Sequence, residues 1–411
     1  MAFEGYRPGS SGYRRVSLSL FAAGIATFAE LYSTQAVLPE LAADFGLSPS
    51  ASALSLSAAT LGIGIALLAV GPLTESLGRT PLMRASLVAA SIVGVCCAIA
   101  PNWPVLLGLR FLQGVALAGF AAVAVAYLRE ELDPAHHGRA TGLYVGGTAV
   151  GGMIGRLLSA GVADAYGWRW GVAAVAALGV VCAVIVLILL PASRGFQPST
   201  GGLRGAWTRT KAVASDPGLL LIYAVTATAM GGFVATYNAL GFRLEASPYL
   251  LGVGVASLVF LTYALGSVGS TVAGTLEDRF GRRTVLPLCL VVALIGLALT
   301  LAEPLWIVIV GIALETTGFF AAHGVASGWT SARASLLAGA PGQAASLYLL
   351  AFYLGSTVFG TVSGVAWTQG GWDAVVVVVA VLFLISIGCS LALRRTPSLL
   401  GRAAPDMTAG H

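Results

Sequence analysis

The sequence predicts an all-α membrane protein in which twelve transmembrane helices form two pseudo-symmetric six-helix bundles. Composition is the first observation behind this prediction, because 57% of the 411 residues are hydrophobic and only 9% are charged. A soluble domain carries roughly 25% charged residues to keep its surface wetted, so we expect lipid to be the main solvent of this chain. Its apolar runs are long and continuous, unlike alternating barrel strands, and at about 20 residues per span they leave room for roughly a dozen helices.

An internal repeat is the second observation. The charged segment 71–79 returns as segment 274–282, 203 residues later, and each copy lies between two apolar runs. Three further pairs keep this spacing to within one residue: 34–36 with 237–239, 139–144 with 343–348, and 167–168 with 371–372. One recurring offset indicates a duplicated unit. Parallel repeats in transporters are related by an axis along the membrane normal, with the path for substrate between them.

The apolar runs place the spans in order along the chain. They are residues 16–40, 50–72, 82–101, 104–128, 140–163, 168–191, 217–240, 250–275, 284–302, 304–330, 342–367 and 372–393. The long polar connection between the sixth and seventh spans divides the chain into units. We therefore expect a first bundle over 1–192, a central loop over 193–216, a second bundle over 217–393 and a tail over 394–411.

The basic residues of the connections predict the orientation of the chain. Arginines and the single lysine are concentrated in the even-numbered connections and the two terminal segments, whereas the opposite side holds only Arg169 and Arg243. The positive-inside rule then puts both termini and the central loop in the cytoplasm. We expect a multi-pass protein of the cell's inner (cytoplasmic, or plasma) membrane that works as a monomer.

Several classes of function lack their sequence signature. We find no G-x-x-x-x-G-K-[ST] loop for ATP, no Ser-His-Asp constellation, no cluster with metal-ligand spacing and no basic aromatic patch for nucleic acid. We therefore expect neither an enzyme nor a protein with a cofactor, a metal site or a nucleic-acid partner.

The two repeated loops combine glycines, a carboxylate and arginines. These residues are Gly71, Glu75, Gly78 and Arg79 in the first copy, and Gly274, Asp278, Arg279, Gly281 and Arg282 in the second. The leading glycines would let helices approach closely, and the carboxylate can cap a neighbouring helix N-terminus and pair with a nearby arginine. We expect a latch that closes the cytoplasmic side in one state and depends mainly on the second copy. Loops that only set topology and solubility are the alternative.

These features resemble the major facilitator superfamily over nearly the whole chain. Segment 274–283 matches the family's loop motif G-x-L-a-D-R-x-G-R-[RK], and segment 110–114 (RFLQG) matches its R-x-x-Q-G motif in the fourth helix. Segment 147–156 looks like the antiporter motif G-x-x-x-G-P-x-x-G-G, but the proline is missing and Arg156 replaces the last glycine. Within the family, the first 170 residues are most similar to the twelve-span drug:proton antiporter branch, in particular its YnfM-type members. The resemblance implies alternating access, with helices 1, 4, 7 and 10 lining a central cavity.

Four charged residues fall inside the expected spans: Glu30, Arg110, Arg156 and Glu315. Burying a charge in hydrocarbon costs roughly 2.5–3.5 kcal/mol on insertion scales, so each needs a reason. With the cavity that the resemblance implies, Glu30, Arg110 and Glu315 are expected to face it and to form a proton and substrate site. Arg156 is a candidate anchor for an anionic substrate. The alternative for Glu30 is a static ion pair with Arg110 or Arg156.

Polar residues near these charges are weaker candidates. His323 follows Glu315 by eight residues and titrates near neutral pH, so it is either a proton relay or a hydrogen-bonded packing residue. Gln35, Tyr237 and Asn238 occupy the 34–36 and 237–239 repeat. They are either lining residues of the substrate cavity or polar contacts between helices.

The sequence thus predicts a secondary transporter of small organic molecules that works by alternating access, most simply proton-coupled efflux (antiport). Its partners would be a small-molecule substrate, protons and the lipid bilayer. The altered motif around Arg156 keeps open a proton-coupled transporter of an organic anion or metabolite. The degraded first loop keeps open a transport-dead sensor with the same fold. The residues do not identify the cargo or the direction of transport.

Overall fold

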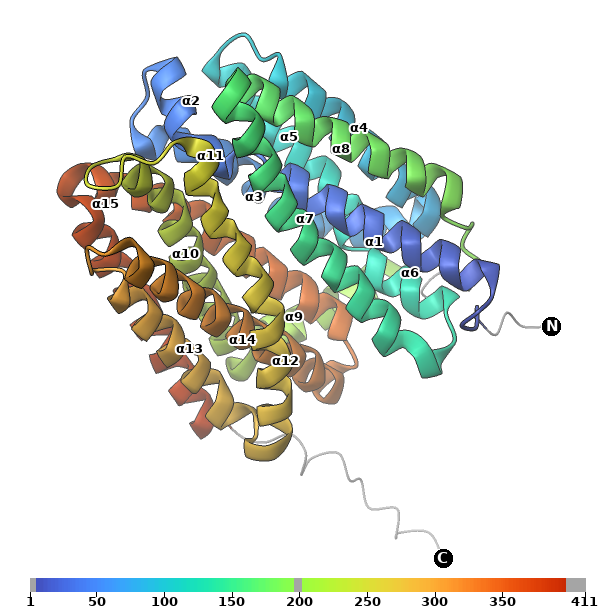
Figure 1. Cartoon of the computed structure of the whole chain (residues 1–411). Helices are drawn as coiled ribbons and strands as arrows, with labels where there is room; N and C mark the ends of the chain where they lie inside the picture. Colours follow the sequence, from blue (N-terminus) through green and yellow to red (C-terminus); the bar gives the residue numbers. More distant parts are fainter. Residues whose placement is uncertain (1–4, 196–201, 397–411) are drawn as a thin grey trace, which may run out of the picture.

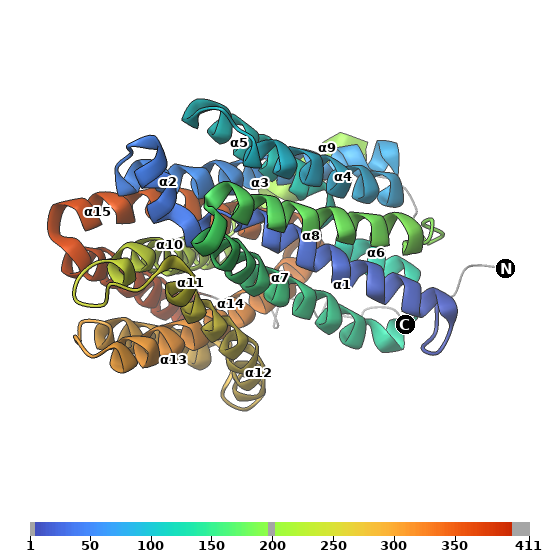
Figure 2. The ribbon, with the colours of Figure 1, turned by 45° about the horizontal axis from the view of Figure 1, so that its top comes forward.

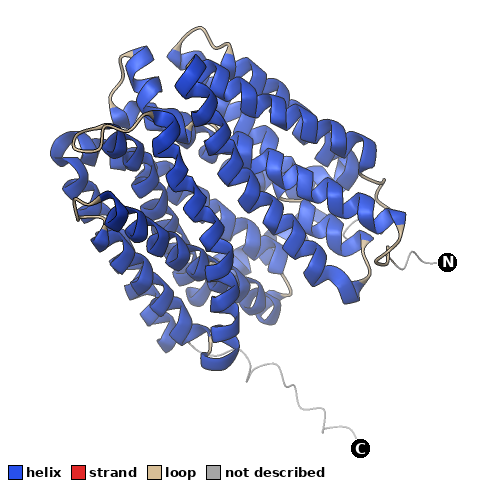
Figure 3. Ribbon diagram, in the orientation of Figure 1, coloured by secondary structure: helices blue, strands red, loops and turns tan. Residues whose placement is uncertain are grey.

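The computed structural model describes residues 5–195 and 202–396, and this part of the chain is almost entirely helical, with no strand (Figure 3). The first group of helices is α1 (Ser11–Leu31), α2 (Leu38–Phe45), α3 (Pro49–Leu77), α4 (Arg79–Ala98), α5 (Trp103–Ala121), α6 (Ala124–Glu131), α7 (His137–Tyr166) and α8 (Trp168–Leu189). The second group is α10 (Pro217–Glu245), α11 (Val253–Ala256), α12 (Tyr263–Phe280), α13 (Arg282–Leu299), α14 (Leu305–Ala338) and α15 (Pro341–Ala392). The predicted all-α fold is confirmed.

The described residues contain 11 helical segments that are long and apolar enough to cross a membrane. The last of them, which includes α15, holds two of the twelve expected spans. The backbone leaves helical geometry at Gly370 and Gly371, where the chain reverses. Gly371 has a φ of 61°, in the left-handed region that favours glycine. A connection this short is enough to join two antiparallel neighbours.

The same backbone joint occurs four times and follows the repeat. Gly78 and Gly281 end α3 and α12 with φ values of 80° and 76°, and Gly167 ends α7 with 85°. Together with Gly371 they form two pairs separated by 203 and 204 residues. These glycines allow two membrane-spanning helices to be joined without a loop, because other residues rarely adopt such a φ. Gly274, expected to permit close helix approach, has no atom within 4 Å of where a Cβ would lie, so that expectation is wrong in this structure.

Three spans are less regular than their apolar runs predict. The first span breaks after α1 and continues through a 3₁₀ turn, η1 (Gln35–Val37), into α2. The eighth begins with α11 and the 3₁₀ segment η3 (Ser257–Thr262) before α12. The fourth is divided between α5 and α6. Polarity alone does not report such breaks, because a distorted helix in lipid needs the same apolar surface as a regular one.

The connection between the two groups is not simply a loop. Residues Gly202–Ala214 form helix α9, which contacts α14, α15 and α10 of the second group. Val213 is fully buried in this contact, whereas Trp207 is exposed. Residues 196–201, and the tail beyond residue 396, lie outside the described residues.

The two groups of helices lie side by side, with α1–α8 in blue to green and α10–α15 in yellow to red (Figure 1). Three sets of contacts join them: α3 packs on α15, α7 packs on α11, η3 and α12, and α10 packs on η1, α2 and α3. Figure 2 shows the second set from another angle. We call the end of the molecule that carries α2 and α11 the α2 end, and the opposite end, where both chain ends emerge, the termini end (Figure 1).

A row of glycines joins α1 and α7. A Cβ at Gly147, Gly151 or Gly155 would meet the α1 backbone at Phe21, Ile25 and Ala29, respectively. This spacing of four residues places the glycines on one face of α7, so two helix backbones come into direct contact. Gly146, one residue from this face, has no atom within 4 Å of its Cβ direction.

We predict that Gly151→Leu destabilises the first group by roughly 1–3 kcal/mol or more, because the added side chain forces α1 and α7 apart. Thermal unfolding of the purified protein measures the effect. Gly146→Leu on the same helix is the matched control and should unfold like the wild type. Equal unfolding temperatures for the two variants would contradict the close α1–α7 contact.

Candidate functional site

Glu30 lies inside the first group of helices. Its side chain is 1% exposed. Oε1 accepts a hydrogen bond from Ser91 Oγ on α4 at 2.9 Å, and Oε2 accepts one from Gln113 Nε2 on α5 at 3.4 Å. On α8, Gly179 has no side chain where Oε1 of Glu30 lies, so a Cβ there would overlap the carboxylate. The Glu30 carboxylate therefore occupies a niche among α4, α5 and α8.

Arg110 is fully buried and binds backbone carbonyls where α1 ends. Its guanidinium donates to the carbonyl oxygens of Glu30 at 2.9 Å, Leu31 at 2.5 Å and Ser55 at 3.1 Å. The bonds to Glu30 and Leu31 satisfy carbonyls that a continuous α1 would have paired, whereas the bond to Ser55 reaches a carbonyl of α3. Within the described residues Glu30 forms no ion pair with Arg110 or Arg156, so the alternative of a static pair is wrong in this conformation. Arg110 instead links α1, α3 and α5.

Arg156 is enclosed by side chains from both groups of helices. Its Nε donates to Gln35 Oε1 at 2.6 Å. The guanidinium carbon lies 4.1 Å from the ring centre of Tyr32, in the first group, and 4.5 Å and 5.1 Å from those of Tyr263 and Phe260, in the second. Cations are attracted to aromatic faces at such distances. Arg156 therefore holds the two groups together near the α2 end.

Gln35 and Asn238 contact each other directly across the two groups. Gln35 Nε2 donates to Asn238 Oδ1 at 2.8 Å, and Asn238 Nδ2 donates to the Gly360 carbonyl at 3.1 Å. The two residues occupy equivalent positions in the repeat, 203 residues apart. Residues related by a two-fold axis meet only close to that axis, so this pair marks the centre of the joint between the groups.

Glu315 lies within the second group and is fully buried. Its Oε1 accepts a hydrogen bond from Thr236 on α10 at 2.8 Å, whereas Oε2 has no hydrogen-bond partner among the described residues. The neighbouring Tyr237 hydroxyl lies 2.8 Å from Thr262 Oγ1 and 2.7 Å from Thr316 Oγ1. No cation accompanies this carboxylate among the contacts of the described residues.

His323 lies in an aromatic cluster of the second group, apart from the four charges. Its Nδ1 is 2.8 Å from the Tyr348 hydroxyl on α15, and its ring packs on Phe319 and Phe352. No hydrogen bond joins His323 to Glu315 in the described part of the chain. The structure thus places Glu30 near Arg110, and Arg156 with Gln35 and Asn238. Glu315 and the adjacent Tyr237 lie apart from both of these sets. His323 lies apart from Glu315 as well.

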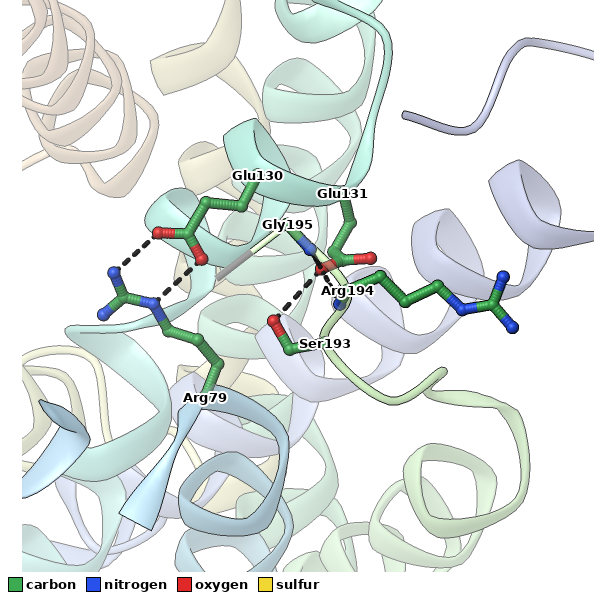
Figure 4. A network of polar contacts seen from close by, with 6 residues as sticks. All are labelled: Arg79, Glu130, Glu131, Ser193, Arg194 and Gly195. Carbon is green, nitrogen blue, oxygen red and sulfur yellow. Dashed lines mark hydrogen bonds and ion pairs between the residues drawn. The ribbon is translucent and has the colours of Figure 1, made fainter. Parts of the chain in front are cut away.

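The first repeated loop is tied to its own group of helices (Figure 4). Arg79 donates two hydrogen bonds to the Glu130 carboxylate, at 2.6 Å and 3.0 Å. The adjacent Glu131 accepts from the Ser193 hydroxyl and from the backbone amides of Arg194 and Gly195. The surroundings of Gly71 and the side chain of Glu75 are not described by the structure, so their part in a latch stays a prediction.

The second repeated loop uses different partners. Arg282 pairs with Glu277 at 2.5 Å. Asp278 forms no ion pair with a described residue in this conformation, and Arg279 lies over the Phe280 ring at 5.1 Å. A pocket of about 650 Å³ adjoins Glu277, Asp278 and Arg282.

Arg333 also lines this pocket and pairs with Asp216, the N-cap residue of α10, at 2.5 Å. Burial alone would raise the pKa of Asp216, but hydrogen bonds from Arg333 and the Leu219 amide more than offset it and hold the pKa below its usual range. Asp216 is therefore ionised at neutral pH and keeps this ion pair.

Sequence reasoning missed Glu130, which pairs with the first loop, and Arg333, which lines the pocket beside the second. Arg333 and Glu130 are 203 residues apart and so occupy equivalent positions with opposite charge. Extending the repeat beyond the loop motif could have found both. Ser91 and Thr236, which bind the two carboxylates, carry no such signal because serine and threonine are frequent throughout the spans.

Comparisons with known proteins agree with this geometry. The sequence model of the Major Facilitator Superfamily matches residues 18–268 and again 219–406. The inner membrane transport protein YnfM of Escherichia coli is 40% identical over 387 residues, covering 94% of this chain and 92% of that protein. The uncharacterized MFS-type transporter YybF of Bacillus subtilis is 35% identical, covering 95% and 96%. A probable 4-methylmuconolactone transporter of Cupriavidus pinatubonensis is 25% identical, covering 71% and 69%.

Solved structures share the fold at lower identity. A bacterial homologue of the human lysosomal transporter Spinster, in an inward-facing and occupied conformation, superposes with a TM-score of 0.77 at 18% identity, covering 96% of this chain and 98% of that one. The same protein in an inward-facing and unoccupied conformation gives a TM-score of 0.75 at 17% identity. Because both a match over most of the chain and a 40% identical relative point the same way, the chain belongs to the Major Facilitator Superfamily of membrane transporters.

Proposed function

We propose that this protein is a secondary active transporter that moves small organic molecules across the cell's inner membrane by alternating access, as a proton-coupled efflux system. One observation carries the alternating-access part. Within the described residues, every hydrogen bond between the two groups lies toward the α2 end, at Gln35–Asn238, at Asp164–Gly254 and between α3 and α15. Hydrogen bonding between the groups at one end alone, among the described residues, fits one of the two states that rocking of two bundles requires.

The orientation of this state follows from the basic residues. The termini end carries most of the arginines, among them Arg14, Arg79, Arg282 and Arg394. The positive-inside rule assigns that end to the cytoplasm, so we interpret the conformation as closed to the outside and open to the inside. The Spinster homologue is inward-facing in both solved structures, which supports the same interpretation.

We assign proton coupling to the two buried carboxylates. An ionised carboxylate buried without a cation costs several kcal/mol, so a buried acid in that situation keeps its proton. Glu315 is in that situation, because a single threonine hydroxyl binds it. Glu30 has two neutral donors and, nearby, a guanidinium engaged with carbonyls. Opening of the α2 end would let water reach these groups and let the protons leave. His323, bound to Tyr348, remains a candidate relay.

In this conformation Arg156 is better placed to hold the α2 end closed than to bind a substrate. Its guanidinium already binds Gln35 and the Gly152 carbonyl and is stacked on rings from both groups. An anionic substrate arriving from the termini end would have to displace these contacts. Transport of an organic anion or metabolite is the second candidate, and the relative described as a probable 4-methylmuconolactone transporter favours a small organic metabolite as cargo.

The repeated loops are proposed as a latch at the termini end. Asp278 has no ionic partner among the described residues, which suits a group whose partner belongs to the closed state. When the termini end closes, Asp278 would approach the N-terminus of α7 or a basic residue of the first group. Arg79 and Arg282 keep the loops rigid through Glu130 and Glu277 in the meantime.

We expect Glu30→Gln and Glu315→Gln each to lower pH-driven transport at least tenfold while substrate exchange continues. Glutamine keeps the hydrogen bonds to Ser91 or Thr236 but cannot release a proton. Flux in proteoliposomes, with and without an imposed pH gradient, measures both activities for a panel of cationic, neutral and anionic organic compounds. Glu303→Gln, on an exposed turn, is the control. A wild-type pH-driven rate in either variant would assign that carboxylate a structural role.

We expect Asn238→Leu to loosen the α2 end. Of the two hydrogen bonds that Asn238 makes, the one to Gln35 crosses between the groups, and its loss, at about 1 kcal/mol, should shift the population toward the opened state roughly fivefold. Double electron–electron resonance between spin labels at Ala43 and Ser247, both exposed at that end, measures the distance between the two groups. Gln343→Leu, at the termini end, should leave the distances unchanged. An unaltered distance distribution in Asn238→Leu would show that the Gln35–Asn238 hydrogen bond does not hold the α2 end closed.

We expect Asp278→Asn to reduce transport several-fold without lowering the amount of protein in the membrane, because the amide keeps the size of the side chain and removes its charge. Quantitative immunoblotting and flux assays test the two parts separately. Asp373→Asn, exposed in the second group, serves as the control. Transport at the wild-type rate in Asp278→Asn is the result that excludes the latch.

A further inference from the structure

Three arginines line a pocket at the termini end of the first group. The pocket has a volume of about 410 Å³ and is bordered by Arg15 on α1, Arg84 on α4 and Arg194 after α8, together with Tyr6 and Ser11. We call it the arginine pocket. No carboxylate is among its lining residues. It is separate from the buried charges and from the repeated loops described above.

The arginines retain unused hydrogen-bond donors. Arg15 donates to the carbonyls of Ile188 and Leu189 at the end of α8, and Arg84 donates to the Leu190 carbonyl at 2.5 Å. Each guanidinium has five N–H donors, so most of them are not used by these bonds. Arg84 Nε is buried and has no hydrogen-bond partner among the described residues. A buried donor of this kind is costly unless an acceptor occupies the pocket.

The carboxylate of Glu131, which binds the segment after α8, does not line the pocket. Glu131 accepts from the Ser193 hydroxyl and from two backbone amides, and the Arg194 side chain extends away from it (Figure 4). Three guanidinium groups therefore adjoin one space without an anionic side chain inside it. Such an arrangement favours an anion with several acceptor oxygens, because phosphate oxygens match the guanidinium fork.

The two arginines on α1 and α4 have no counterpart at the equivalent positions of the repeat. Gly218 and Pro287 stand 203 residues after Arg15 and Arg84. In the second group the guanidinium of Arg333 lies against Gly218, but it is paired with Asp216. The first group thus differs in that its arginines adjoin a space that no carboxylate lines.

The positions of Arg15 and Arg84 along their helices match the thickness of the lipid headgroup layer. Arg15 is four residues from the start of α1 and Arg84 five from the start of α4, which corresponds to roughly 6–8 Å along each helix. Beside them the last turn of α8 exposes Leu187 and Ile188, side chains suited to acyl chains. The headgroup layer on each side of a bilayer is about 5–8 Å thick.

We propose that the arginine pocket binds the phosphate of an anionic phospholipid headgroup in the leaflet at the termini end. Basic pockets between spans on the cytoplasmic side are suited to such headgroups. The lipid phosphate would receive hydrogen bonds from Arg84 Nε, Arg15 and Arg194, and its acyl chains would lie along α8. This proposal requires insertion into a membrane and is independent of the substrate, coupling and direction of transport.

Thermal unfolding of the full-length protein in non-ionic detergent micelles tests the proposal. Three additives are compared: phosphatidylglycerol, phosphatidylcholine and inorganic phosphate. We expect phosphatidylglycerol to raise the Tm by several degrees, and the other two to leave it nearly unchanged. In the double variant Arg15→Gln with Arg84→Gln, at least half of that rise should be lost. Arg395→Gln removes one exposed arginine at the same end of the molecule and should keep the full rise.

Arg194→Gln keeps the test decisive if the double variant does not fold, because the Arg194 side chain makes no hydrogen bond or ion pair with a described residue. It should reduce the rise caused by phosphatidylglycerol. An undiminished rise in the folded arginine variants would overturn the site. An equal rise with inorganic phosphate would overturn the lipid as occupant in favour of a soluble anion, and an equal rise with phosphatidylcholine would overturn the requirement for net negative charge.

Discussion

Inside the membrane, every polar backbone group and every charge must find a partner without water, and this structure depends on that constraint. In hydrocarbon an unpaired carbonyl or a bare charge costs several kcal/mol, so each departure from a regular helix needs a local partner. Arg110 illustrates the solution, because its guanidinium binds the carbonyls at the break after α1 and the break in turn allows Gln35 to reach the second group. One buried cation thereby connects the shape of the first span to the joint between the groups.

The duplicated architecture carries unequal chemistry in its two groups. The glycine joints at Gly78 and Gly281 have nearly the same backbone geometry. The charges beside them differ, since Glu130 in the first group corresponds to Arg333 in the second, and each has recruited a different partner. Backbone geometry is common to both copies because the helices must turn in the same way. The side chains are free to differ, so gating, coupling and lipid contacts can be divided between the groups.

The polar contacts also divide the molecule along its length. Toward the α2 end, amides, hydroxyls and the stacked Arg156 link the two groups. Toward the termini end, the charged side chains pair within their own group, as Arg79 does with Glu130. In the proposed cycle, rotation of the groups about the α2 end would leave these ion pairs intact. A lipid phosphate in the arginine pocket would add a contact between the first group and the bilayer at the moving end.

The sequence by itself determined the all-α class, the number of spans and the duplication, because lipid imposes length and polarity on every helix and a repeat leaves a fixed offset. It also singled out the four buried charges, whose cost makes them conspicuous. Only the tertiary structure decided which groups meet. Glu30 is turned into a niche beside Gly179, Arg156 is held between Tyr32 and Tyr263, and Asp278 is without an ionic partner among the described residues. The direction of a side chain around its helix and the packing of distant helices are cooperative properties that no local pattern encodes.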